Sequence, residues 1–193
     1  MISAGKKLVL ASGSPRRKIL LGQIGLTFEV RESGVDESID VGDNPATHVT
    51  VLSQQKASAV ADGYDDAIII GADTVVVLDG KIIGKPSDER EAEVMLNALS
   101  GRWHEVYTGF TLVDRPSDRQ ISRVEMTKVK FRKLADSEIA EYVRSGSPMD
   151  KAGAYGIQDD YGAVFVERIE GCFYTVVGFP LTKFYVTLKE FLS

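Results

Sequence analysis

The sequence predicts a mixed α/β fold, built on an elongated mixed sheet that is flanked by helices. Strand-like and helix-like runs alternate along its 193 residues, and 44% of these residues are hydrophobic, which is enough for a sizeable core. Asp79-Gly80 and Glu170-Gly171 each lie between apolar runs, a pattern typical of tight hairpin turns and therefore of antiparallel strand pairs. The length suits a single domain over residues 1–193, organised as two closely packed lobes.

Capping residues and glycine stops delimit the predicted helices. Ser14 and Asn44 each precede a proline, the combination expected at a helix start. Ser87 is expected to cap a third helix, which Gly101 ends. The helices are expected at residues 15–24, 45–62, 88–100, 136–144 and 181–192.

The predicted strands are rich in β-branched and apolar residues. The strand that begins at residue 67 continues past Gly71 to the Asp79-Gly80 turn and returns after it. The last two predicted strands form a second hairpin around Glu170-Gly171. The strands are expected at residues 7–10, 28–30, 67–70 with its continuation, 106–113, 121–131, 163–169 and 172–177.

Composition excludes several classes of protein. A net charge of −5 argues against a general nucleic-acid binder, and no segment approaches the ~20 apolar residues of a membrane span. The first residues lack the apolar run of a secretory signal, so we expect a cytoplasmic protein. A single cysteine, Cys172, permits no internal disulfide and fits a reducing compartment. Two histidines and one cysteine rule out a cysteine–histidine zinc site.

Residues 11–18, ASGSPRRK, place three cations in the first turn of a helix, where the helix dipole disfavours positive charge. In one interpretation the three side chains point into water and cost a few tenths of a kcal/mol each. In the other, which we favour, the hydroxyl-rich turn at Ser12 and Ser14 and the guanidinium groups of Arg16 and Arg17 hold phosphates.

Lys56 falls near the middle of a helix face that Val49, Leu52 and Val60 define. A lysine in that place either extends its ammonium group to the solvent or reaches into a cleft toward an anion. We favour the second interpretation.

The Asp79-Gly80 turn predicts the strand pairs that follow from it. Leu78 would face Lys81 and Val76 would face Ile83, which brings Lys85 opposite Thr74. Asp73, one residue away, would then lie next to an ammonium group, where it could hold a metal ion or orient a water molecule. An ordinary ion pair at a sheet edge is the alternative.

Residues 149–158, MDKAGAYGIQ, combine small residues with an amide side chain. Small residues permit close backbone approach, and the Gln158 amide could hydrogen-bond a base edge. A simple glycine-rich turn is the alternative.

The chain resembles the Maf proteins, relatives of the inosine triphosphate pyrophosphatases, in three segments: LASGSPRRKILL (10–21), GADTVVVLDGKIIGKP (71–86) and DKAGAYGIQ (150–158). The resemblance covers essentially the whole chain and implies an inosine triphosphate pyrophosphatase-like fold, with two lobes around a central cleft that holds the site. At Thr74 and Gln158 the sequence resembles the branch of the family that acts on dTTP and UTP, not the branch that acts on 7-methyl-GTP.

The resemblance implies hydrolysis between the α- and β-phosphates of a nucleoside triphosphate, giving the monophosphate and pyrophosphate. It places the catalytic acid/base at Asp73 and substrate discrimination at Arg16, Thr74 and Gln158. The phosphate- and metal-binding residues that it implies are Ser12, Arg17, Glu37, Lys56 and Lys85.

A triphosphate carries about four negative charges, so Mg²⁺ or Mn²⁺ is expected to bridge its oxygens to Asp73 and Glu37. The family also suggests a homodimer. A nucleotide-binding regulator of cell division or septum formation with little turnover is one alternative, and a hydrolase of another phosphate ester is a second. The intact set of Asp73, Lys56 and Lys85 favours turnover over the first alternative.

Two positions depart from the family pattern. After Gln158 the chain continues as Asp159-Asp160-Tyr161, where the family commonly has a short glycine-rich turn. Gln55 stands where a glutamate often precedes the lysine. The first departure affects the fineness of base selection, and the second affects how Lys56 is held.

Overall fold

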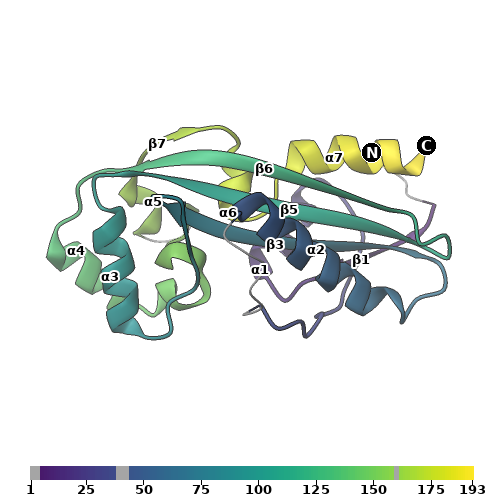
Figure 1. Ribbon diagram of the computed structural model, residues 1–193, viewed down its shortest axis with the longest axis horizontal. Helices are drawn as coiled ribbons and strands as arrows, with labels where there is room; N and C mark the ends of the chain where they lie inside the picture. Colours follow the sequence, from purple (N-terminus) through teal and green to yellow (C-terminus); the bar gives the residue numbers. More distant parts are fainter. Residues whose placement is uncertain (1–4, 38–43, 159–160) are drawn as a thin grey trace. The chain divides into compact units, whose positions relative to one another are not determined.

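The computed structural model describes residues 5–37, 44–158 and 161–193. Its strands are β1 (Lys7–Ala11), β2 (Glu29–Val30), β3 (Ala67–Leu78), β4 (Lys81–Ile83), β5 (Trp103–Arg115), β6 (Gln120–Phe131) and β7 (Val166–Glu170). Its helices are α1 (Pro15–Gln23), α2 (Pro45–Ala61), α3 (Glu89–Leu99), α4 (Asp136–Arg144), α5 (Gly162–Phe165), α6 (Phe173–Val177) and α7 (Leu181–Leu192), with the 3₁₀ turns η1 (Ser147–Asp150) and η2 (Ala152–Ala154). Figure 1 follows this order along the chain.

The strands form a seven-stranded sheet in the order β2-β1-β3-β5-β6-β7, with β4 paired to β3. Strand β1 runs parallel to both β2 and β3, whereas β4 is antiparallel to β3 and β7 is antiparallel to β6. The predicted mixed sheet flanked by helices is therefore confirmed. Among the described residues, no helix combines the length and apolar composition that a membrane crossing requires.

The chain divides into two compact units. The first unit holds the residues up to Asp73 together with Thr108–Glu125 and Gly178–Ser193, and the second holds Thr74–Tyr107 and Met126–Val177. The division falls within β3, β5 and β6. The cleft expected between two lobes stays a prediction.

In the first unit, α2 packs on the parallel strands β1 and β3. The helix begins as predicted at Asn44, whose side chain accepts a hydrogen bond from the Thr47 N–H. Its apolar face shares a fully buried cluster with the strands. The buried members are Val9, Ala11, Ala57, Val60, Ala61, Ala67, Ile69 and Val113.

The Asp79-Gly80 hairpin has the predicted register, with Leu78 opposite Lys81 and Val76 opposite Ile83. Asp79 and Gly80 both have positive φ, as the tight turn requires. The described ladder ends at Val76 and Ile83, so the strand pairing does not extend to Thr74 and Lys85 as predicted. Gly84 breaks the returning strand, and its carbonyl instead accepts a bond from the Gly153 N–H.

The start of α3 differs by one residue from the prediction. Asp88, not Ser87, is the N-cap, and its carboxylate accepts a hydrogen bond from the Glu91 N–H at 2.8 Å. Ser87 instead donates its own N–H and hydroxyl to the Glu91 carboxylate. Serine and aspartate both cap helices well, so neighbouring positions compete and sequence alone does not decide between them. In the second unit α3 and α4 lie side by side (Figure 1).

The second predicted hairpin, around Glu170-Gly171, is wrong. Residues 163–165 belong to the helix α5, and the strand β7 begins only at Val166 and pairs with β6 instead of with the chain that follows it. Residues 173–177 form the helix α6. The main chain turns away because Cys172 pairs with a side chain: its N–H donates to Thr127 Oγ1, which donates to the Cys172 carbonyl. That carbonyl also accepts from the Thr175 N–H and starts a helical turn. Tertiary contacts here override a strand-favouring composition.

An aromatic cluster around His104 forms part of the second unit's core. The imidazole is 3% exposed and packs edge-on against Phe131 and Tyr155. Its Nε2 lies 2.8 Å from the Tyr155 hydroxyl, and its Nδ1 is buried without a hydrogen-bond partner. Burial lowers the pKa of His104 from 6.5 to about 4, so the ring is neutral near pH 7.

The buried His104 predicts a loss of stability in mild acid. Because its folded-state pKa lies below its ordinary value, the unfolded chain binds the proton first, and stability falls as pH drops from 6.5 toward about 4. We expect the free energy of unfolding to fall by about 2 kcal/mol between pH 7 and pH 5. Urea unfolding at both pH values measures this difference. His104→Gln should lose most of it, and an equal difference in that variant would contradict the assignment.

Candidate active site

Two glycines let α2 lie unusually close to the sheet. A Cβ placed on Gly71 of β3 would lie 2.1 Å from the Ser53 carbonyl oxygen, and one on Gly109 of β5 would lie 2.7 Å from the Val49 carbonyl oxygen. Any larger side chain at these positions would push the helix away. The close contact at Ser53 is one helical turn before Lys56, and Gly71 is two residues before Asp73. The glycines therefore set how near Lys56 comes to Asp73.

Lys56 connects two carboxylates. Its ammonium nitrogen lies 2.7 Å from Asp73 Oδ1 and 2.7 Å from Glu37 Oε1. Lys56 is 4% exposed and Asp73 is 6% exposed, whereas the side chain of Glu37 is 44% exposed. The predicted inward direction of Lys56 is confirmed, and the ion triad of Lys56, Asp73 and Glu37 has one end at the surface.

Of the three cations at the start of α1, Arg17 is the one that is buried. Its guanidinium is buried, donates from Nη1 to the Ser12 hydroxyl at 3.2 Å and donates from Nε to the Gly178 carbonyl at 3.0 Å. The Ser14 N–H also donates to the Ser12 hydroxyl, and the side chain of Ser14 makes no capping bond. Lys18 is exposed, so only part of the cationic run turns inward.

The electrostatics tie Arg17 to the triad. Burial lowers the pKa of Arg17 from its ordinary value, and the negative charges of Asp73 and Glu37 act in the opposite direction, while Arg16 lowers it further. Because arginine starts from a very high pKa, the group keeps its charge. The first unit thus holds Ser12, Arg17, Glu37, Lys56 and Asp73, which the resemblance assigns to the site; their joint role stays a prediction.

Two features of this site had no sequence signal. The Gly178 carbonyl that holds Arg17 lies 161 residues away along the chain. The carboxylate of Glu32 lies over Gly13, where a Cβ would be 2.9 Å from Glu32 Oε1. The glycine of the Ser12-Gly13-Ser14 turn therefore makes room for a carboxylate, which composition alone does not indicate.

Of the other predicted site residues, Arg16 is partly exposed in α1 of the first unit, and the remaining three belong to the second unit. Thr74 follows Asp73 in β3 and is partly exposed, and Lys85 is exposed after β4. Gln158 is partly buried at the end of the 150–158 segment. The joint arrangement of these residues with the triad stays a prediction.

The 150–158 segment is held by contacts with the preceding turn and with β3. Buried Lys151 donates to the Ser147 carbonyl at 2.5 Å and to Asp150 Oδ1 at 2.9 Å. Gly153 has φ +68, and a Cβ there would lie 2.9 Å from Val76 Cγ2. Glycine is required at position 153 both by the positive φ and by the close approach of the backbone to β3. The segment therefore packs on the hairpin and carries Gln158 at its end.

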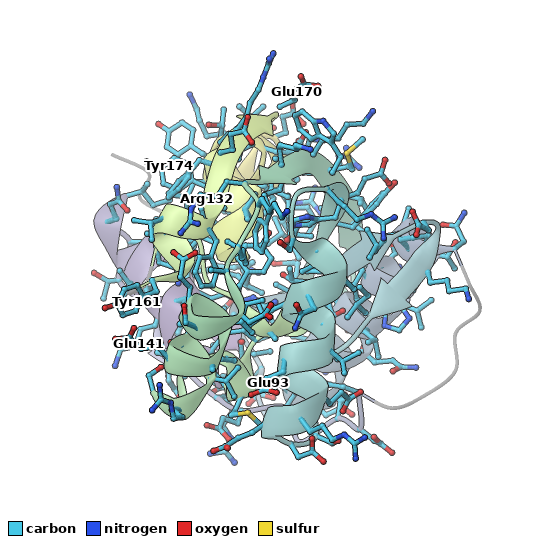
Figure 2. The ribbon with its side chains drawn as sticks, turned by 90° about the vertical axis from the view of Figure 1, so that its left-hand side faces the viewer. Glu93, Arg132, Glu141, Tyr161, Glu170 and Tyr174 are labelled. Carbon is cyan, nitrogen blue, oxygen red and sulfur yellow. The ribbon has the colours of Figure 1, made fainter. Side chains whose placement is uncertain are left out.

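After Gln158 the sequence departs from the family pattern at residues 159–161, of which Asp159 and Asp160 lie outside the described residues. Tyr161 is described: it is exposed, and its hydroxyl donates to Glu141 Oε1 of α4 at 3.2 Å. Figure 2 shows these two side chains next to each other. The tyrosine thus anchors the chain to α4 just before α5 begins.

The triad offers oxygen ligands to a divalent metal ion. Glu37 and Asp73 both lie at 2.7 Å from one ammonium nitrogen, so their carboxylates are close together. Within residues 5–37, 44–158 and 161–193, no group of three or more His, Cys, Asp or Glu is arranged to hold a metal. Magnesium is commonly held by one or two carboxylates plus substrate phosphates. This carboxylate pair fits that mode and not a dedicated protein cage.

Comparison with solved structures identifies the class of fold, the one found in HAM1 proteins. A solved HAM1 protein from Coxiella burnetii has the same fold, with a TM-score of 0.52 at 13% identity over 96% of this chain and 99% of that one.

Sequence comparison is more specific. Residues 7–191 match the family described as Maf-like protein, so this chain belongs to the Maf family. A protein of Pelotomaculum thermopropionicum named dTTP/UTP pyrophosphatase is 49% identical, over 96% of this chain and 97% of its own. One of Carboxydothermus hydrogenoformans with the same name is 51% identical, over 95% and 98%. The resemblance in the three sequence segments is confirmed.

The close packing of α2 can be tested with a glycine substitution. Gly71→Ala should push α2 outward and destabilise the protein by about 2 kcal/mol, with overpacking as the cause. Gly22→Ala is the matched control, because Gly22 lies in α1 with open space around its Cβ position, and it should be neutral or slightly stabilising. Chemical unfolding of both variants measures the difference. Equal stabilities would contradict the close approach of α2 to β3.

Proposed function

We propose that this protein hydrolyses nucleoside triphosphates, dTTP and UTP above all, to the monophosphate and pyrophosphate. The observation that carries the proposal is the buried Lys56–Asp73 pair, joined by Glu37 and lying in the same unit as the buried Arg17. Membership of the Maf family and the names of the two relatives support this substrate class.

Asp73 is proposed as the acid/base. Its carboxylate accepts a proton from a water molecule while the water oxygen forms a bond to the α-phosphorus. The bond from that phosphorus to the α,β-bridging oxygen breaks, and pyrophosphate leaves with the electron pair. Lys56 donates a hydrogen bond to Asp73 Oδ1 and so holds the carboxylate in a fixed orientation.

The cations neutralise the charge that grows on the leaving pyrophosphate. Arg17, Lys56 and Lys85 are proposed for this role, and the turn with Ser12 and Ser14 supplies hydroxyl and N–H groups to phosphate oxygens. Fixed donors of this kind are each worth roughly 10²–10³ in rate. Arg17 is already held by two hydrogen bonds, so it need not reorganise during the reaction.

Base selection is assigned to Arg16, Thr74 and Gln158. An amide such as that of Gln158 offers both a donor and an acceptor, which matches the edge of a pyrimidine ring. The support for this assignment is the resemblance of the Thr74 and Gln158 segments to the dTTP and UTP branch.

A divalent cation, Mg²⁺ or Mn²⁺, is the proposed cofactor, and Glu37 and Asp73 are the residues that would hold it. When bound, it would supply positive charge to the triphosphate. Support comes from the hard oxygen ligands of the carboxylate pair and from the partly exposed side of Glu37, which leaves an approach from solvent.

We further infer a cytoplasmic homodimer with no nucleic-acid or membrane partner. A single half-buried thiol, Cys172, suits a reducing compartment, and the net charge of −5 disfavours a nucleic-acid partner. The dimer is supported by the family resemblance alone. A regulator with little turnover is disfavoured, because such a protein has no need of a buried acid/base held by lysine.

A substrate panel tests the proposed reaction. With Mg²⁺ or Mn²⁺, we expect pyrophosphate from dTTP and UTP, and much less from CTP, dATP, GTP and 7-methyl-GTP. Separate assays of pyrophosphate and orthophosphate measure the outcome. Orthophosphate as the first product would contradict the reaction, and a preference for purines would contradict the roles given to Thr74 and Gln158.

The role of Asp73 is tested by Asp73→Asn, which keeps the side-chain shape and removes the base. Turnover should fall by at least about 10²-fold because the attacking water loses its proton acceptor. The matched control is Asp65→Asn, an exposed aspartate near the start of the same strand, which should keep full activity. Circular dichroism should show both variants folded; a folded Asp73→Asn protein with normal turnover would remove Asp73 from its role.

A further inference from the structure

A chain of side-chain hydrogen bonds links α2 to β5 and β6 within the first unit. Gln54 Nε2 lies 3.1 Å from Ser122 Oγ, which lies 2.8 Å from Thr111 Oγ1. Thr111 Oγ1 lies 2.8 Å from Ser53 Oγ, which in turn lies 2.8 Å from the Thr50 carbonyl oxygen. Ser53 and Thr111 are fully buried. The chain therefore begins and ends on α2 and crosses two strands.

The direction of every hydrogen bond in this chain follows from its last link. The Thr50 carbonyl can only accept, so the single Ser53 hydroxyl proton is used there. Ser53 must then accept from Thr111, and Thr111 must accept from Ser122. The Gln54 amide donates to Ser122 and completes the sequence. All the hydrogen bonds therefore run in one direction along this chain of side chains, and each hydroxyl hydrogen has one defined orientation.

A fully ordered chain of this kind resists movement of α2. Shifting the helix would leave buried hydroxyls unpaired, and each unpaired buried group costs about 1–3 kcal/mol. The close contacts at Gly71 and Gly109 limit inward movement of the helix, whereas the hydroxyl chain limits its rotation and sliding. Ser53 lies one turn before Lys56 and on the same side of the helix.

We propose that Ser53, Thr111 and Ser122 are positioning residues for Lys56: through this ordered chain they hold α2 so that the Lys56 ammonium stays on Asp73. None of the three touches the reacting groups. The proposal rests on the proposed function, because Lys56 and Asp73 are the groups whose placement it serves.

The middle of the chain is the place to break it. Thr111→Val keeps the shape of the side chain and removes the hydroxyl, which leaves Ser53 without its donor and Ser122 without its acceptor. We expect kcat for pyrophosphate release from dTTP to fall about 10-fold, with KM within about twofold, since small misplacements at a reacting centre are costly. Thr111→Ser should restore most of kcat. Thr187 is a buried threonine of α7 that does not belong to this hydrogen-bond chain. Thr187→Val is therefore the matched control and should leave kcat unchanged.

A double variant separates positioning from general destabilisation. If Thr111 acts through Lys56, adding Thr111→Val to Lys56→Met should lower kcat by less than about twofold beyond Lys56→Met alone. An undiminished 10-fold loss in the Lys56→Met background would overturn the proposal. Failure of Thr111→Ser to rescue kcat would overturn it as well.

An activity-independent measurement distinguishes failure of this proposal from failure of the proposed function. Amide hydrogen exchange over residues 53–57 should be at least about 10-fold faster in Thr111→Val than in Thr187→Val, because the chain no longer holds this turn. Equal exchange would overturn the proposal even if dTTP is hydrolysed. Faster exchange in a protein that releases no pyrophosphate would show that the chain holds α2 and that the proposed function is the part in error.

Discussion

The buried ion pair between Lys56 and Asp73 is the interaction on which the rest of the first unit depends. Two charges at 4% and 6% exposure have lost most of their hydration, and their attraction seldom repays that loss by a wide margin. A pair of apolar residues would stabilise the fold at least as well. The pair is therefore best explained by chemistry, and the fold has to supply what holds it: Glu37 as a second carboxylate, a close helix and a chain of ordered hydroxyls.

The constraint extends to residues that have no chemistry of their own. Gly71 and Gly109 let the α2 backbone approach the sheet, and the small side chain of Ala57 lies over Gly71, where an added Cβ would be 2.9 Å from the Ala57 Cβ. Arg17 of α1 is also oriented by a backbone group. The Gly178 carbonyl accepts a hydrogen bond from its guanidinium, which also contacts Ser12. The Arg17 guanidinium is thus fixed by a backbone contact, and under the proposed function this lowers the reorganisation needed for binding phosphate.

Local patterns predicted the parts of the structure that local physics controls. The Asp79-Gly80 turn gave the correct register at Val76 and Leu78, and the position of Lys56 on an apolar face gave its inward direction. The errors came from competition between near-equal local choices or from distant contacts. Asp88 replaced Ser87 as a cap, and the side chain of Thr127 bound Cys172 and turned the expected strand into α6. The partner of Arg17 was invisible for a different reason, because a backbone carbonyl carries no sequence signature.

The proposed roles of Asp73, Glu37 and Lys56 can be tested with a crystal structure that contains Mn²⁺ and an α,β-imido analogue of dTTP, which pyrophosphate release cannot consume. We expect an anomalous manganese peak at Glu37 and Asp73, with Lys56 Nζ still hydrogen-bonded to Asp73 and with Arg17 in contact with phosphate oxygens. Nucleotide and manganese bound away from Asp73 and Lys56 would contradict these roles.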